Sequence, residues 1–69
     1  MRMVVYVGDK IKHLRDTRAL TQEELAKKVG ITVAALSRIE RNHAEPRATT
    51  RRKLAQALGL DPAELVEDS

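Results

Sequence analysis

The chain lacks the residues that build disulfides and most metal sites. Its 69 residues include no cysteine and only two histidines, His13 and His43. The absence of cysteine excludes a disulfide framework, a thiolate zinc site and a cysteine nucleophile. Two histidines are too few for a histidine cage. We therefore expect neither a metal nor a cofactor.

Long apolar runs are missing as well. No stretch approaches the roughly 18 apolar residues that a membrane-spanning helix needs. The apolar start, residues 1–7, is too short for the hydrophobic region and cleavage site of a signal peptide. We expect a cytoplasmic protein that makes no membrane contact.

Aromatic residues are reduced to Tyr6, so the core must be aliphatic. Charge is uneven along the chain: residues 1–60 carry all thirteen lysines and arginines against six acids, whereas residues 61–69 carry four acids and no base. A basic body suits a partner with a negative backbone, of which nucleic acid is the commonest. On charge alone, a merely soluble surface explains the pattern equally well.

Start and stop signals predict an all-α protein, a compact bundle of five short helices. Thr21 and Glu24 have the spacing of a capping box, and Gly30 supplies a stop nine residues after Thr21. Asp9, Thr32 and Asp61 are further candidate caps. The expected helices span residues 9–18, 22–29, 33–41, 49–58 and 61–67.

The N-terminal segment has a different composition. Residues 3–7 are rich in β-branched side chains and end at Gly8, which predicts a short strand. Such a strand could pair with its copy in a second subunit; a loosely packed arm is the equal alternative. We therefore divide the chain into an arm or strand, residues 1–8, and a helical domain, residues 9–69.

Residues 22–41, QEELAKKVGITVAALSRIER, resemble the helix-turn-helix of the phage repressor and Cro type, also called the XRE family. Ala26 provides the small residue at the helix crossing and Gly30 the turn, and apolar residues stand at inner positions 25, 29, 31, 36 and 39. The resemblance extends over residues 9–67. It implies a lambda-repressor-like fold and a non-enzymatic transcriptional regulator, a repressor that binds an inverted-repeat operator in double-stranded DNA as a homodimer.

The resemblance also implies the residues that contact DNA. In this family the third helix enters the major groove and the preceding helix crosses the phosphate backbone. Gln22 would then contact a phosphate. The residues that would face base edges are Thr32, Val33, Ala34, Ser37 and Arg38. The residues that would lie along the DNA backbone beyond them are Arg41, Asn42 and His43.

Some residues of the motif have alternative roles, and two others are expected to act in the fold rather than at DNA. Val33 and Ala34 stand where several relatives have glutamine or another polar reader; apolar contact with thymine methyls is one role for them and a packing or dimer contact the other. For Ser37, plain solvent exposure is the alternative. Arg15 and Glu40 are expected to form a partly buried ion pair between the first and third helices, as family members often do.

The alternative function is an antitoxin or protein–protein adaptor built on the same fold. The apolar start of the third helix and the acidic tail suit a protein partner, a toxin or polymerase. An enzyme is the weakest interpretation, because no nucleophile–base pair, carboxylate pair or phosphate-binding glycine loop is visible in the sequence.

Overall fold

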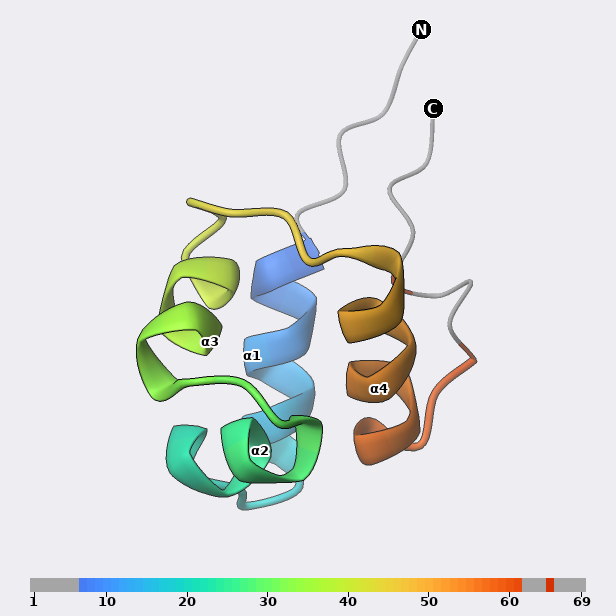
Figure 1. The fold of residues 1–69 in the computed structure, drawn as a ribbon. Coiled ribbons are helices and arrows are strands. Elements are labelled where there is room, and N and C mark those ends of the chain that lie inside the picture. Colours follow the sequence, from blue (N-terminus) through green and yellow to red (C-terminus); the bar gives the residue numbers. More distant parts are fainter. Residues whose placement is uncertain (1–6, 62–64, 66–69) are drawn as a thin grey trace, which may run out of the picture.

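The computed structural model describes residues 7–61 and residue 65, and these form a bundle of four helices (Figure 1). The helices are α1 (Val7–Thr17), α2 (Gln22–Val29), α3 (Val33–Glu40) and α4 (Ala48–Leu58). α1 and α2 each pack against both α3 and α4. Within the described residues there is no strand. The all-α prediction is confirmed at this level.

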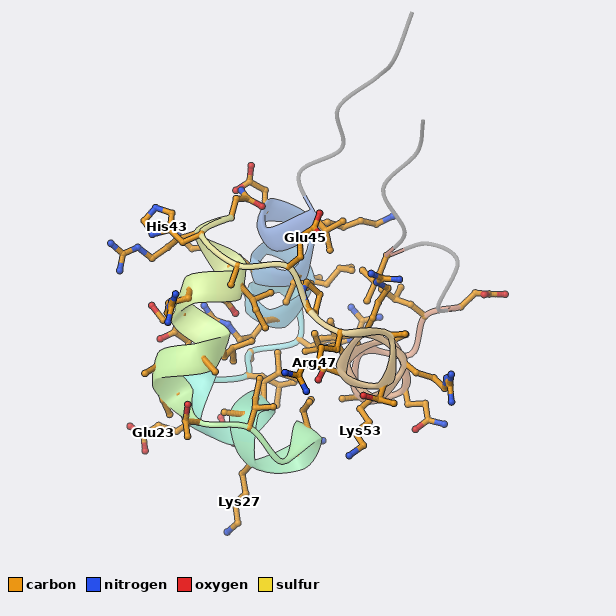
Figure 2. The ribbon with its side chains drawn as sticks, turned by 45° about the horizontal axis from the view of Figure 1, so that its top comes forward. Glu23, Lys27, His43, Glu45, Arg47 and Lys53 are labelled. Carbon is orange, nitrogen blue, oxygen red and sulfur yellow. The ribbon has the colours of Figure 1, made fainter. Side chains whose placement is uncertain are left out.

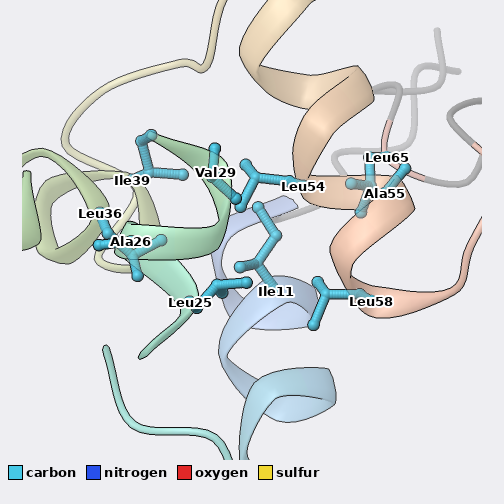
Figure 3. Packing of buried hydrophobic residues seen from close by; sticks show 10 residues of the cluster. All are labelled: Ile11, Leu25, Ala26, Val29, Leu36, Ile39, Leu54, Ala55, Leu58 and Leu65. Carbon is cyan, nitrogen blue, oxygen red and sulfur yellow. The ribbon is translucent and has the colours of Figure 1, made fainter. Parts of the chain in front are cut away.

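The core is aliphatic, and all four helices contribute to it (Figure 3). Ile11, Leu25, Leu36 and Leu54, one from each helix, are completely buried. Of the predicted inner positions of the motif only Ile31, in the turn, is half-buried rather than buried. Among the described residues, the buried hydrophobic core cluster comprises Ile11, Leu25, Ala26, Val29, Leu36, Ile39, Leu54, Ala55, Leu58 and Leu65.

The first helix begins earlier than the sequence predicted. Val7 and Gly8 belong to α1, so the expectation of an arm or strand through residue 8 is wrong for these two, and Asp9 lies inside the first turn rather than at the cap. Gly8 is buried because α1 crosses the end of α3 here: a Cβ on Gly8 would collide with the backbone oxygen of Ile39. This contact joins distant parts of the chain, so no local pattern signals it. Residues 1–6, which carry the rest of the predicted strand, lie outside the described residues.

The C-terminal end lies mostly outside the described residues. The predicted fifth helix, over residues 61–67, lies outside the described residues except for Asp61 and Leu65. Leu65 is completely buried in the core. α4 begins one residue earlier than predicted, at Ala48, and its cap, Arg47, makes no side-chain hydrogen bond to the helix.

Each of the four helices is followed by a residue in the left-handed backbone region; after α3 it is Asn42, at φ 61°. Gly30 after α2 has φ 82° and Gly59 after α4 has φ 71°. The equivalent turn after α1 is made by Ala19, at φ 55°. A left-handed residue with a Cβ costs roughly 1–2 kcal/mol relative to a relaxed one. The α1–α2 connection is therefore held in a strained conformation by the packing on either side.

Candidate nucleic-acid interface

The turn between α2 and α3 is fixed by hydrogen bonds at both ends. The backbone amides of Gly30 and Ile31 both donate to the carbonyl of Ala26, at 2.8 and 3.0 Å. Thr32 then starts α3: its Oγ1 accepts a hydrogen bond from the amide of Ala35 at 3.0 Å. Ala26 itself is buried at the helix crossing. These contacts orient α3 rigidly on α2.

The outer face of α3 consists of exposed residues with little apolar bulk. Thr32, Ala34 and Arg38 are exposed, and Ser37 is half-buried. Val33 is 39% exposed and is the large apolar residue that stands out on the described surface. Small side chains at the start and a guanidinium one turn later allow close approach to a partner surface at one end and a charged contact at the other.

The inner face of α3 ends in a buried polar cluster around Glu40. Its carboxylate accepts hydrogen bonds from Nε of Arg15 at 2.7 Å and from Nη2 of Arg15 at 3.1 Å. Glu40 is 3% exposed and Arg15 9%. The hydrogen bond to Glu40 raises the pKa of Arg15, although burial opposes it. The expected ion pair between the first and third helices is thus present.

Gln22, expected at a phosphate, also joins this cluster. Its Nε2 donates to Oε1 of Glu40 at 3.0 Å. As the first residue of α2, Gln22 also carries a backbone amide that has no acceptor within its own helix. The cluster therefore ties together α1, α2 and α3 beneath the outer face of α3, and sequence reasoning had found only its Arg15–Glu40 part.

The residues after α3 split into two groups. Arg41 and His43 are exposed, and Figure 2 shows His43 projecting away from the bundle beyond the end of α3. Asn42 is also exposed, but its side chain bonds to the first turn of α1. Of the three residues expected along the DNA backbone, Asn42 is the one whose side chain makes hydrogen bonds to another part of the chain.

A shallow groove between α3 and α4 adds a basic residue that the sequence analysis did not select. Arg38 and Arg47 both line it, together with Glu45, over an apolar floor that includes Ile31 and Pro46. In Figure 2, Arg47 lies on the side of α4 that faces α3. The available signal was its place directly after Pro46, at the start of a helix with no acidic residue in its first turn.

The described residues offer neither a metal site nor a membrane-spanning helix. Residues 7–61 and 65 contain no group of three or more histidine, cysteine, aspartate or glutamate side chains that could hold a metal ion. None of the four helices is long and apolar enough to cross a membrane, as far as the described part of the chain extends.

Known proteins resemble this chain over most of its length. The chain is 41% identical over 66 residues to an uncharacterised helix-turn-helix-type transcriptional regulator of Sinorhizobium fredii, covering 96% of this chain and 86% of the relative. It is 38% identical over 60 residues to the immunity repressor of Bacillus phage phi105, covering 87% of this chain and 42% of the repressor.

Solved structures match the fold closely. The P22 c2 repressor, crystallised with a synthetic operator, superposes with a TM-score of 0.84 at 32% identity, over 87% of this chain and 91% of the repressor chain. A chain of the SinR–SinI protein complex superposes with a TM-score of 0.81 at 31% identity, over 87% and 59% of the two chains. A helix-turn-helix family model matches residues 11–65. The chain therefore belongs to the helix-turn-helix family of the phage-repressor (XRE) type.

Proposed function

We propose that this chain is a sequence-specific DNA-binding transcriptional regulator of the repressor type, with α3 inserted in the major groove. The observation that carries the proposal is the contrast within α3: a buried polar cluster holds one face, and exposed small and basic side chains form the other. The P22 c2 repressor, whose chain superposes on this one, was solved with a synthetic operator. The basic body of the chain, residues 1–60, fits the charge of a DNA backbone.

The proposed readout is shared between hydrogen bonds and apolar contacts. Arg38 donates a bidentate pair to a guanine, which discriminates against other bases by about 1–3 kcal/mol. Val33 and Ala34 touch thymine methyl groups, because neither side chain can hydrogen-bond. Thr32 and Ser37 are the remaining candidates for base contacts. With so few polar readers, part of the specificity comes from DNA shape.

Phosphate contacts flank this readout. Gln22 is proposed to meet a phosphate at the start of α2, where the helix dipole favours an anion. Arg41 and His43 extend the contact beyond the other end of α3. Arg47 is proposed as a further phosphate contact, since it lines the same groove as Arg38.

We further propose that the regulator acts as a homodimer on an inverted repeat. Two half-sites about one helical turn apart, roughly 34 Å, would then mirror the twofold axis. The candidate interfaces are the N-terminal segment, residues 1–8, and the C-terminal segment around Leu65. Occupying such an operator blocks or recruits polymerase and requires no catalysis.

The direct test is binding to fragments of the source genome in excess random competitor DNA, across a salt series. We expect a few fragments to be retained, to share an inverted repeat and to bind more weakly as salt rises. The slope of log affinity against log salt then reports about 0.9 per phosphate contact. Failure of every fragment to beat the competitor would refute the proposed function.

Arg47 has a charge-matched control on its own helix. Arg52 lies two positions after Thr50, which lines the groove, so it is turned about 200° around α4 from that position. Arg47→Ala should reduce the salt slope by about 0.9, the value of one lost phosphate contact, and Arg52→Ala should leave it unchanged. Equal effects from the two variants would remove Arg47 from the interface.

The second candidate function is a protein-binding adaptor or antitoxin. The exposed Val33 favours it, since an apolar residue at the start of α3 can contact a protein as well as a thymine methyl. A protein partner, SinI, accompanies SinR in one of the similar structures. Arg38→Ala separates the two functions: it should weaken operator binding in a regulator and leave partner binding intact in an adaptor.

A further inference from the structure

Asn42 makes contacts that a residue lying along the DNA backbone does not need. Its Oδ1 accepts a hydrogen bond from the backbone amide of Gly8 at 3.0 Å, and its Nδ2 donates to Oδ1 of Asp9 at 3.3 Å. Both partners belong to the first turn of α1. The side chain that follows α3 thus bonds to the start of a helix more than thirty residues earlier in the chain.

These two bonds suit the start of a helix. The first backbone amides of an α-helix have no acceptor inside it, and Gly8 is the second residue of α1. Asparagine is among the best capping side chains; here it caps from another part of the chain. Because Asp9 holds the NH₂ group of the same amide, the oxygen is directed to Gly8.

The backbone at Asn42 explains why asparagine suits the position. Its φ is 61°, in the left-handed region that glycine and asparagine adopt at helix ends. Directly beneath it, Gly8 meets α3 so closely that a Cβ would collide with the backbone oxygens of Ile39 and Glu40. The Asn42 amide and this close approach together hold the last turn of α3 on the first turn of α1.

We propose that Asn42 is a positioning residue rather than a phosphate ligand. It clamps the end of α3 to α1 and thereby sets the direction in which its neighbours Arg41 and His43 meet the DNA backbone. This inference rests on the proposed function and deepens it. It replaces the expectation that Asn42 itself lies against DNA.

Exchanging the clamp's two side chains tests the proposal. Asn42→Asp places a carboxylate beside Asp9, whereas Asp9→Asn with Asn42→Asp keeps an acceptor at position 42 for the Gly8 amide and supplies a donor from position 9. The net charge of the exchanged protein equals that of the starting chain. Asn42→Gly serves as the second variant, because it keeps the left-handed backbone and removes both hydrogen bonds.

Urea unfolding and operator affinity are measured for each variant of the full chain, the latter at a temperature at which every variant is folded. The unfolding constant of Asn42→Asp should rise, because its carboxylate repels that of Asp9 where the hydrogen bond was, and should return when Asp9→Asn is added. Asn42→Gly removes the oxygen that accepts from the Gly8 amide, so its unfolding constant should rise about fivefold, the size of a lost helix cap. Operator affinity should fall with Asn42→Asp and with Asn42→Gly, and the exchange should restore it.

Three results would overturn the proposal. An affinity loss in Asn42→Asp that persists after the exchange, while stability recovers, would show that position 42 itself lies against a phosphate, which a carboxylate there repels. Unchanged affinity in all folded variants would reduce the clamp to a stabilising contact. If the unaltered chain binds no fragment above competitor, the regulator function fails and the positioning role with it, while the unfolding constants still show independently whether the clamp exists.

Discussion

The two faces of α3 obey different constraints. On the inner face, Leu36 and Ile39 fill the core and Glu40 accepts three hydrogen bonds from other helices. On the outer face, Val33 and Arg38 are exposed to solvent. The inner residues are explained by contacts within the chain, whereas the outer residues are those that the proposed function assigns to DNA. A substitution on the inner face should therefore change folding, and one on the outer face should change binding.

Breaking the Glu40 cluster should have the largest effect. Glu40→Gln removes the buried counter-charge of Arg15 and leaves it only the exposed carboxylate of Asp16, 3.3 Å from Nη1. This should cost about 3–5 kcal/mol of unfolding free energy. For a domain of this size that is enough to lower the helical circular dichroism at room temperature. Urea and thermal unfolding measure the loss.

A double variant separates the lost charge partner from lost packing. Arg15→Met with Glu40→Leu removes both charges and keeps apolar volume, so it should recover most of the stability that Glu40→Gln loses. A double variant as unstable as Glu40→Gln would show that the ion pair itself, rather than the unpaired charge, governs folding.

Arg38→Ala makes the matching test on the outer face. The unfolding free energy should change by no more than about 0.5 kcal/mol, since the side chain is exposed. Operator affinity should fall and preference at one base pair should relax by about 1–3 kcal/mol. Binding to a panel of operators, each changed at one base pair, measures both effects, with Arg52→Ala as the charge control. An unchanged base preference would take the reader role away from Arg38.

Ala19 offers a change that should alter stability without touching either face of α3. Ala19→Gly removes the Cβ from a left-handed residue, at φ 55°, and the gain should be up to about 1 kcal/mol after the extra freedom of the unfolded chain is subtracted. In a domain of this length this raises the melting temperature by about 4–8 °C. Operator affinity should stay the same.

The same substitution inside a helix should have the opposite sign. Ala57→Gly in α4 should lower stability by about 1 kcal/mol, because glycine weakens a helix interior. If both variants were destabilised, the strain assigned to the left-handed backbone at Ala19 would be absent.

The sequence predicted those parts of the molecule that depend on local patterns. Thr21 and Thr32 mark helix starts through side-chain hydrogen bonds to an amide three residues later, and Gly30 marks a helix end through its left-handed backbone. The inner residues of the motif follow a helical repeat. The parts that were missed depend on distant contacts. The local pattern predicts Gly8 as the end of a strand, because the contact that places it in α1 is with the end of α3, more than thirty residues away.

The same limit applies to the candidate site. The exposure of Val33 and Arg38 follows from the helical repeat, whereas the engagement of Gln22 with Glu40 requires the crossing of α2 and α3. Arg47 joins the candidate site because it lines a groove that only the folded chain forms. The roles of all these residues toward DNA remain predictions.

Glu24 is an exposed counterpart to the buried Glu40, and replacing it should have the smallest effect on stability. Its Oε1 accepts a hydrogen bond from the backbone amide of Thr21 at 2.9 Å, which lowers the pKa of Glu24 below its ordinary value of 4.5. A carboxylate whose pKa is lower in the folded than in the unfolded state stabilises the fold at any pH above its unfolded-state pKa. This stabilisation is lost as the pH falls through its folded-state pKa.

Glu24→Gln keeps an oxygen for the Thr21 amide and removes only the charge. Urea midpoints at neutral and acidic pH should therefore fall less between the two conditions in Glu24→Gln than in the unaltered chain. Glu23→Gln is the control, since it removes the same charge from a residue that lies next to Glu24 and takes no part in the hydrogen bonds of the capping box. If both variants reduced the pH dependence of the urea midpoint equally, the overall negative charge on α2, rather than the hydrogen bond to Thr21, would account for that dependence. A dependence specific to Glu24 would show that even an exposed side chain, when its partner lies within the chain, behaves like the inner face of α3 and acts on folding.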